Sequence, residues 1–210
     1  VQQWHENVVC IAKESCYRFI DTVVSDVVAL FREAGAPLTT MQTGGDEIPS
    51  GAWEGSPLCR MCMEERGMQS IQELLNYFLG RFRDILKKHE LVMAGWEEIA
   101  LTKEKVDGKE VCTPNPAFIN ANFRPYVWNN LWGSGQEDFA YKLANAGYQT
   151  VLSNVTNLYF DLAYEKDPDE PGYYWGGFLS TRKPFEFCPL DIYITEATDI
   201  WGTPIAADVI

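Results

Sequence analysis

The feature that most constrains the fold of this chain is an alternation of short, strand-like segments with longer segments of helical periodicity. Strands that are joined through helices pair in parallel through right-handed crossovers. The four strand-like segments are LTTMQT (residues 38–43), LVMAGW (91–96), RPYVWNNLW (124–132) and YQTVLSN (148–154). The sequence therefore predicts an α/β fold built on a parallel sheet.

Three other segments are expected to form helices. The first is predicted to be capped by Ser15, to end at Gly35 and to bury one apolar face. This face consists of Phe19, Ile20, Val23, Val24, Val27, Leu30 and Phe31. The second helix carries its apolar residues between Ile71 and Leu86, and the third, QEDFAYKLANAG, ends at Gly147.

The length of the chain limits how much of a barrel it holds. A closed eight-stranded α/β barrel typically needs about 250 residues, and four strands are too few to close one. The 210 residues, 46% of them hydrophobic, suffice for one sizeable core. The turn-rich stretch 165–189 is interpreted as an elaborate loop. We expect residues 1–210 to form one partial barrel domain that is truncated at both ends.

The charge of the chain argues against some partners. The formal net charge is −13, with 30 acidic and 17 basic residues and no cluster of Lys or Arg. Nothing here would neutralise a phosphate backbone, so no nucleic acid partner is expected. No apolar run approaches the roughly 20 residues that span a bilayer, so no membrane segment is expected in this stretch.

The six cysteines do not form a metal-binding pattern. Only Cys59 and Cys62 are closely spaced, and a structural zinc site needs a second such pair or nearby histidines. The two histidines, His5 and His89, are single and far apart. We therefore predict no metal site and interpret the cysteines as buried free thiols.

Acidic and aromatic residues recur where the predicted strands end. In a parallel barrel the carboxyl ends of all strands lie on one face, where such barrels build active sites. The residues expected there are Asp46, Glu47, Trp96, Trp128, Tyr159 and Asp161. Aromatic rings pack against the apolar C–H faces of sugars, and a few carboxylates orient the hydroxyl groups. This set indicates a carbohydrate site.

The adjacent carboxylates Asp46 and Glu47 suit glycoside hydrolysis in particular. This reaction commonly uses two acids, a protonated one that donates to the leaving oxygen and a charged one that stabilises positive charge. Neighbouring residues in an extended chain point in opposite directions. We therefore expect the two side chains to contact different parts of one ligand.

Five stretches occur in order along most of the chain: GGDE (44–47), GWEE (95–98), Trp128, LYFDL (158–162) and DEPGYYWGGF (169–178). This ordered set resembles glycoside hydrolase family 20, the exo-acting β-N-acetylhexosaminidases, and within it the chitobiase-like bacterial branch. The ordered set is far more specific than any one motif. The resemblance implies a TIM barrel, of which this chain covers roughly strands four to seven with their helices.

For the acids, the resemblance implies a retaining, substrate-assisted reaction. Glu47 is similar to the general acid that protonates the glycosidic oxygen, and Asp46 to the residue that orients the 2-acetamido group of the substrate. The acetamido oxygen then acts as the nucleophile and forms an oxazolinium intermediate, and Tyr159 hydrogen-bonds this oxygen. The implied substrate carries a terminal N-acetylglucosamine or N-acetylgalactosamine, on glycans or chitobiose, and no cofactor is implied.

For the sugar rings, the resemblance implies that Trp96 and Trp128 wall the acetamido pocket. Asp161 would hold sugar hydroxyls, and Trp175 would stack on the leaving-group sugar. Family members also use an Arg from an early strand and a Trp and a Glu from the final strand, none of which matches a residue of this chain. The resemblance suggests a periplasmic or extracellular location.

One departure and two alternatives accompany this interpretation. Gln42 stands where the family usually has His, two places before the first glycine, so the bracing of the acids is expected to differ. A non-catalytic N-acetylhexosamine-binding relative would keep the aromatic residues. A nucleotide cyclase shares GGDE, but there the motif lies on a hairpin turn and is followed by Phe, where this chain has Ile48.

The other distinctive residues have simpler explanations. Trp53, Trp132 and Trp201 are expected to pack in the core or on the surface. Glu97 and Glu98 are expected to be solvated acids.

Overall fold

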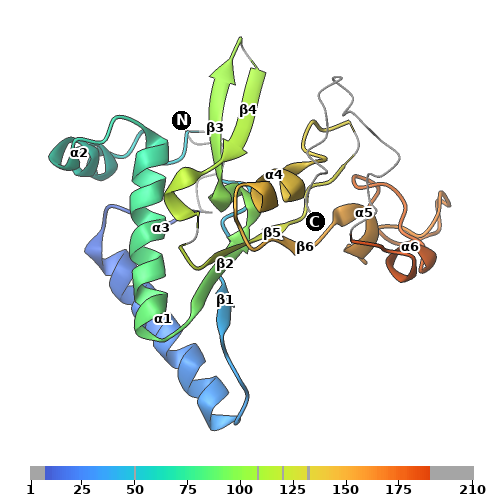
Figure 1. Ribbon diagram of the computed structural model, residues 1–210, viewed down its shortest axis with the longest axis horizontal. Helices are drawn as coiled ribbons and strands as arrows, with labels where there is room; N and C mark the ends of the chain where they lie inside the picture. Colours follow the sequence, from blue (N-terminus) through green and yellow to red (C-terminus); the bar gives the residue numbers. More distant parts are fainter. Residues whose placement is uncertain (1–7, 50, 108, 120, 132, 190–210) are drawn as a thin grey trace. The chain divides into compact units, whose positions relative to one another are not determined.

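The computed structural model describes residues 8–189, except residues 50, 108, 120 and 132 (Figure 1). The chain divides into two compact units, Val1–Phe123 and Arg124–Ile210. Within the described residues, no helix combines the length and the apolar character that a membrane crossing requires.

The first unit begins with helix, strand and two helices, continues with a strand and a short 3-10 turn, and ends with a hairpin and a second 3-10 turn. These elements are α1 (Glu14–Glu33), β1 (Thr40–Gln42), α2 (Pro57–Arg66), α3 (Ile71–Lys88), β2 (Val92–Trp96), η1 (Glu97–Ala100), β3 (Leu101–Val106), β4 (Lys109–Pro114) and η2 (Pro116–Phe118). The hairpin of β3 and β4 projects from the rest of this unit (Figure 1).

The strands β1 and β2 pair in parallel, with Thr40 opposite Val92 and Gln42 opposite Ala94. Met93 and Ala94 are fully buried in β2, and α3 leads directly into this strand. The predicted strand, helix and parallel strand are thereby confirmed in this unit. β1 covers only three residues of the predicted segment 38–43.

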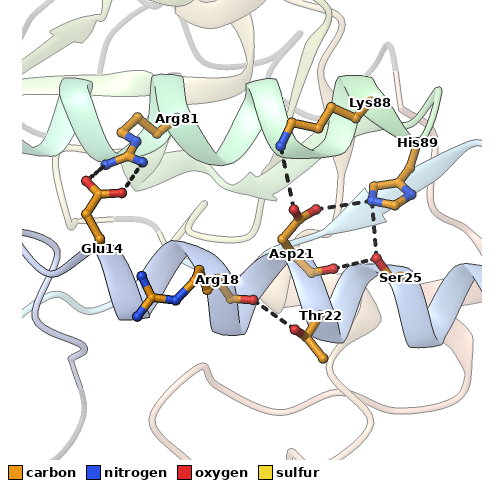
Figure 2. Close-up of polar contacts among 8 residues, drawn as sticks. All are labelled: Glu14, Arg18, Asp21, Thr22, Ser25, Arg81, Lys88 and His89. Atoms are coloured by element: carbon orange, nitrogen blue, oxygen red, sulfur yellow. Dashed lines mark hydrogen bonds and ion pairs between the residues drawn. The ribbon is translucent and has the colours of Figure 1, made fainter.

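Helices α1 and α3 run side by side in the same direction and are joined by ion pairs (Figure 2). Arg81 of α3 donates to the Glu14 carboxylate, with 2.8 Å between Nη2 and Oε2. About two turns further along α1, the Asp21 carboxylate lies 3.5 Å from Lys88 Nζ and 3.3 Å from His89 Nε2. The Arg81 guanidinium also lies over the Tyr17 ring, 3.5 Å from its centroid. These contacts set the relative register of the two helices.

The structure corrects two expectations about α1. The helix begins at Glu14 with Lys13 at the N-cap position and no side-chain capping bond, so the Ser15 cap is wrong. Val24 is buried as expected, but Phe19 and Leu30 are 65% and 63% exposed. The helical periodicity is thus present, while only part of its apolar face is covered by the described residues.

The second unit repeats the parallel pairing with shorter elements. Its elements are β5 (Phe123–Val127), α4 (Phe139–Asn145), β6 (Val151–Leu152), α5 (Val155–Leu158) and α6 (Arg182–Phe185). β5 and β6 pair in parallel, with Tyr126 opposite Val151. Both strands and the helix between them are confirmed, but each is shorter than the segment predicted for it. The predicted loop 165–189 contains α6.

Candidate active site

The predicted acids lie in the loop that follows β1, here called the acid loop (residues 43–49). The backbone N–H and the hydroxyl of Thr43 both donate to the carbonyl of Ala94, at 2.8 and 2.9 Å. The N–H of Trp96 in turn donates to the Gly44 carbonyl at 3.0 Å. These bonds extend the pairing of β1 and β2, and they fix the start of the acid loop against the strand that ends at Trp96.

Two glycines allow the acid loop to lie this close to β2. A Cβ on Gly45, whose φ is +96°, would lie 2.1 Å from Cγ2 of Ile99. A Cβ on Gly95 would lie 2.0 Å from Cδ1 of Ile99 and 2.8 Å from the Gly44 carbonyl oxygen. Ile99 is buried and fills the space that both glycines leave. The position of the acids therefore depends on Gly45, Gly95 and Ile99 together.

Asp46 and Glu47 are both exposed on this loop. Glu47 has a φ of +49°, in the left-handed region that residues other than glycine rarely adopt. The expectation that the two acids sit in an extended chain is therefore wrong. Asp46 lines a cavity of about 260 Å³ together with apolar residues that include Ile48 and Trp53. Gln42, which stands where the family usually has His, contacts the acid loop directly. Its side-chain oxygen accepts a hydrogen bond from the Gly44 N–H.

The residues that follow β2 give one confirmation and one correction. Trp96 is the last residue of β2, as predicted, and it is half-buried. Glu97 is only 1% exposed, so its description as a solvated acid is wrong. The chain enters η1 directly after Trp96, and this tight turn places Glu97 inside the fold.

Of the tryptophans without an assigned role, Trp53 packs in the core of the first unit. It is 8% exposed, and its Nε1 donates to the Val9 carbonyl at 2.8 Å. Trp132 and Trp201 lie outside the described residues. Cys59 and Cys62 are buried free thiols, as predicted, but the predicted burial is wrong for Cys188, which is exposed, and Cys10, Cys16 and Cys112 are only partly buried. Among the residues that the structure describes, no group of three or more His, Cys, Asp or Glu could hold a metal ion.

In the second unit the structure brings three predicted residues together. The rings of Trp128 and Tyr159 stack with centroids 6.4 Å apart. Trp175 meets both rings edge-on, at 6.1 Å from Trp128 and 5.8 Å from Tyr159. We call these three residues the aromatic cluster. Trp128 directly follows β5, and Tyr159 directly follows α5.

Trp175 reaches the cluster because the turn-rich stretch folds back on the segment that carries Asp161. The Asp161 carbonyl accepts from Tyr173 N–H, and the Tyr173 carbonyl accepts from Ala163 N–H, both at 2.9 Å. A Cβ on Gly176 would lie 2.8 Å from Leu162 Cδ1, so glycine permits the close approach after Trp175. Asp161 itself is exposed beside this pairing.

The pair Asn130 and Thr156 supports the aromatic cluster, and the sequence did not identify it. The Asn130 amide donates to the Thr156 hydroxyl at 2.8 Å, and the Thr156 N–H donates to the Asn130 side-chain oxygen at 3.3 Å. Asn130 is 7% exposed. The pair ties the loop after Trp128 to the helix before Tyr159. Its only signal in the sequence is a pair of polar residues after a strand, which is too common to be informative.

The structure thus places the predicted residues in two groups. Asp46, Glu47 and Trp96 belong to the first unit, and Asp161 and the aromatic cluster belong to the second. Asp46, Trp96 and Trp128 lie at or just after the carboxyl ends of parallel strands, which is where α/β barrels build their active sites. Comparison with protein families gives the narrower assignment. The model of glycosyl hydrolase family 20, catalytic domain, matches residues 1–206, and the chain belongs to this family.

Relatives with known names agree with this assignment. A beta-hexosaminidase of Vibrio vulnificus is 31% identical over 212 residues, which cover 99% of this chain and 24% of the relative. An N,N'-diacetylchitobiase of Vibrio harveyi is 31% identical over 206 residues, which cover 84% of this chain and 22% of the relative. The chain therefore spans about a quarter of the length of these relatives.

Solved structures confirm the fold class. The family 20 exo β-N-acetylglucosaminidase of Vibrio harveyi, in complex with N-acetylglucosamine, superposes with a TM-score of 0.69 at 29% identity, over 89% of this chain and 25% of that one. The Streptomyces plicatus beta-hexosaminidase shares the fold, with a TM-score of 0.57 at 19% identity. These relatives are TIM barrels, and this chain forms part of one. The family assignment rules out the nucleotide cyclase, and the acid loop follows a parallel strand and not a hairpin turn.

Proposed function

We propose that residues 1–210 are part of the catalytic domain of an exo-acting β-N-acetylhexosaminidase, which removes terminal N-acetylglucosamine or N-acetylgalactosamine with retention of configuration. The observation that carries the proposal is the acid loop of a family 20 chain, held against β2 by the Thr43 and Trp96 hydrogen bonds. The names of two relatives, a beta-hexosaminidase and an N,N'-diacetylchitobiase, support the proposal.

The two acids take different steps of the reaction in this proposal. Asp46 holds the N–H of the substrate's 2-acetamido group, so that the acetamido oxygen attacks the anomeric carbon. Glu47 donates its proton to the glycosidic oxygen while that bond breaks. The products are the freed leaving group and an oxazolinium ion. Water then attacks the anomeric carbon, and the Glu47 carboxylate takes its proton, which restores the enzyme.

The remaining predicted residues bind the sugar. The Tyr159 hydroxyl donates a hydrogen bond to the acetamido oxygen, and Trp96 and Trp128 form walls for the acetamido group. The stacking of Trp128 on Tyr159, with centroids 6.4 Å apart, supports a shared role for these two side chains. Asp161 accepts hydrogen bonds from sugar hydroxyls, and Trp175 stacks on the leaving-group sugar. The exposed fraction of Trp175, 49%, leaves a ring face available for this contact.

The proposal is tested with the full-length protein that contains this chain and an aryl β-N-acetylglucosaminide. Hydrolysis should release the aryl group, and Glu47→Gln should reduce this activity. Glu54→Gln is the matched control, because Glu54 is an exposed acid in the same region with no role in the proposal. N-acetylglucosamine binding without hydrolysis would instead favour the non-catalytic relative. Equal activity of Glu47→Gln and Glu54→Gln would contradict the assignment of the acid.

A further inference from the structure

The proposed reaction makes no use of the hairpin formed by β3 and β4. Its residue pairs run from Leu101 opposite Pro114 to Val106 opposite Lys109. In the part of the chain that the structure describes, no third strand pairs with this hairpin. Because an isolated two-stranded hairpin is at best marginally stable in water, a ribbon of this length depends on a firm base or on a binding partner.

The base of the hairpin is fixed to the rest of the first unit. The backbone N–H of Asn115, just after β4, donates to the carbonyl of Ala100, just before β3, at 2.8 Å. The side-chain amide of Asn115 donates to the side-chain oxygen of Asn76 in α3, also at 2.8 Å. Asn115 is only 1% exposed. These bonds hold both strands at one end, and the rest of the ribbon projects from there (Figure 1).

The hairpin begins at the same end of the parallel sheet as the acid loop. Trp96 ends β2, η1 follows, and β3 begins at Leu101. Within η1, Ile99 fills the space that Gly45 leaves in the acid loop. Figure 1 shows the hairpin extending beyond the carboxyl ends of β1 and β2. The base of the ribbon therefore lies beside the loop that carries Glu47.

The leaving group of an exo-acting glycosidase extends in the same direction. Only the terminal sugar enters the pocket at the strand ends, and the glycosidic oxygen that Glu47 protonates joins this sugar to the rest of the glycan. The rest of the glycan must leave through the open side of the pocket, beyond the carboxyl ends of the strands. The strand β3 has 6 residues, which at about 3.4 Å per residue span about 20 Å. This length exceeds that of one sugar ring.

One face of the hairpin offers side chains that suit a sugar chain. Because side chains alternate between the faces of a strand, this face consists of Thr102, Glu104 and Val106 of β3 with Val111 and Thr113 of β4. Glu104 and Thr113 are exposed, and Val106 and Val111 are 50% and 41% exposed. Hydroxyl and carboxylate oxygens hydrogen-bond sugar hydroxyls, and valine methyl groups contact apolar C–H faces.

The opposite face and the charge pattern narrow the choice of ligand. On the opposite face Leu101 is buried, and Cys112 and Pro114 are partly buried, so this face is the more protected one. The hairpin sequence TKEKVDGKEV intersperses Lys with acidic residues. It therefore has no field of a single sign that would attract a strongly charged polymer. An uncharged glycan suits the exposed face better than a nucleic acid or an acidic polysaccharide does.

We propose that the hairpin is a substrate arm, whose exposed face binds the part of a linear, uncharged N-acetylhexosamine oligosaccharide that lies beyond the leaving-group sugar. The inference rests on the proposed function, because it takes Glu47 as the acid at the scissile bond. It adds to that function a substrate class, namely chains of three or more sugars. It also adds a binding surface on which the specificity for chain length depends.

Kinetics on chitin oligomers of increasing length test the substrate arm. The probes are the dimer, trimer and tetramer of N-acetylglucosamine and an aryl β-N-acetylglucosaminide, whose leaving group contains no sugar. With the full-length protein, kcat/KM from initial rates should rise from the dimer to the longer oligomers. The triple variant Glu104→Ala, Val111→Ser and Thr113→Ala should lower kcat/KM for the trimer and tetramer by about 2- to 10-fold, the effect of losing one hydrogen bond. The dimer and the aryl substrate should be unaffected.

Two further variants serve as controls. Lys103→Ala changes an exposed side chain on the opposite face of β3 and should leave all four kcat/KM values unchanged. A shortened hairpin, in which Asn-Gly replaces residues 103–112 as a tight turn, should remove the preference for longer oligomers and retain aryl hydrolysis. Thermal unfolding shows whether each variant is folded.

The outcomes separate the substrate arm from the proposed function. Absence of aryl hydrolysis by the wild-type protein would contradict the proposed function, and the arm with it. If the aryl substrate is hydrolysed, equal kcat/KM values of the triple variant and wild type on the trimer and tetramer would overturn the arm alone. The same loss on all four substrates would show a structural role and would also overturn it. So would a change in oligomeric state in light scattering, which would assign this face to a second copy of the chain.

Discussion

Replacement of Gly45 by alanine tests how the acid loop is held. The new Cβ would lie 2.1 Å from Cγ2 of Ile99, far inside contact distance, and the backbone φ of +96° disfavours any side chain. Gly44 offers a matched control in the same loop. Its φ is +75°, but a Cβ there would meet nothing closer than the Asp46 side chain at 3.9 Å. Gly45→Ala adds strain and a clash, whereas Gly44→Ala adds strain alone.

The two contributions have different sizes. A side chain in the left-handed region costs about 1 to 2 kcal/mol, and overpacking a filled core costs about 1 to 3 kcal/mol. Gly45→Ala should therefore destabilise the closed acid loop by about 2 to 5 kcal/mol, and Gly44→Ala by about 1 to 2 kcal/mol. Because about 1.4 kcal/mol corresponds to a factor of ten, the loop should open roughly 30- to several-thousand-fold more often in Gly45→Ala, and roughly 5- to 30-fold more often in Gly44→Ala.

Hydrogen exchange of the full-length protein measures this opening. The Thr43 and Trp96 amides close the loop through their bonds to Ala94 and Gly44, so their exchange reports its opening. Ile99→Ala removes the Cγ2 atom, and the remaining Cβ lies at an acceptable 3.6 Å. In that background Gly45→Ala should cost only the strain, which gives a coupling of about 1 to 3 kcal/mol. Equal exchange in Gly45→Ala and Gly44→Ala, or no coupling to Ile99, would refute this reasoning.

Three further predictions concern the acids, the aromatic cluster and the helix pair. Glu47→Gln should slow the hydrolysis of substrates with poor leaving groups by a factor on the order of 10² or more, whereas Asp46→Asn should slow substrates with good and poor leaving groups alike. Steady-state kinetics on a series of leaving groups measures both effects. If the two patterns were exchanged between the mutants, the assigned roles would be reversed. Thr156→Val removes the hydroxyl that accepts from the buried Asn130 amide and should cost about 1 to 3 kcal/mol in denaturant unfolding, whereas Thr156→Ser should largely preserve stability. The hydrogen bond from Arg81 lowers the pKa of Glu14 below its ordinary value of 4.5, so this contact stabilises the fold above that value and loses its effect as the pH falls through the lowered pKa. The stability difference between wild type and Glu14→Gln should therefore shrink on acidification below 4.5, and a difference that grows instead would show that the sign is wrong.

The sequence predicted the parallel α/β organisation because periodicity and strand-end positions depend on local pattern. LVMAGW is buried on both faces and became β2, and the amphipathic segment from Ile71 became α3. The helix α2 was missed, although Ser56 before Pro57 and Gly67 after Arg66 are helix boundary signals. The hairpin of β3 and β4 was also missed, because its strands carry charged residues in place of a clean apolar alternation.

The site was predictable as a set of residues but not as a geometry. Strand ends identified Trp96 and Trp128, while the return of Trp175 to Tyr159 depends on the path of a long loop. Glu97 was misjudged because its burial follows from a tight turn after β2 that polarity alone does not reveal. The fit of Ile99 between two glycines arises from tertiary packing and leaves no local signal.

The central claim is that the substrate's own acetamido group is the nucleophile. The most direct measurement is the ratio of kcat/KM for an aryl β-N-acetylglucosaminide to that for the matching aryl β-glucoside, with the full-length protein. Because a well-oriented intramolecular nucleophile is worth many orders of magnitude in effective concentration, the ratio should be at least on the order of 10³. Comparable kcat/KM values for the two substrates would contradict the account, because the glucoside has no acetamido group for Asp46 to orient and for Tyr159 to hydrogen-bond.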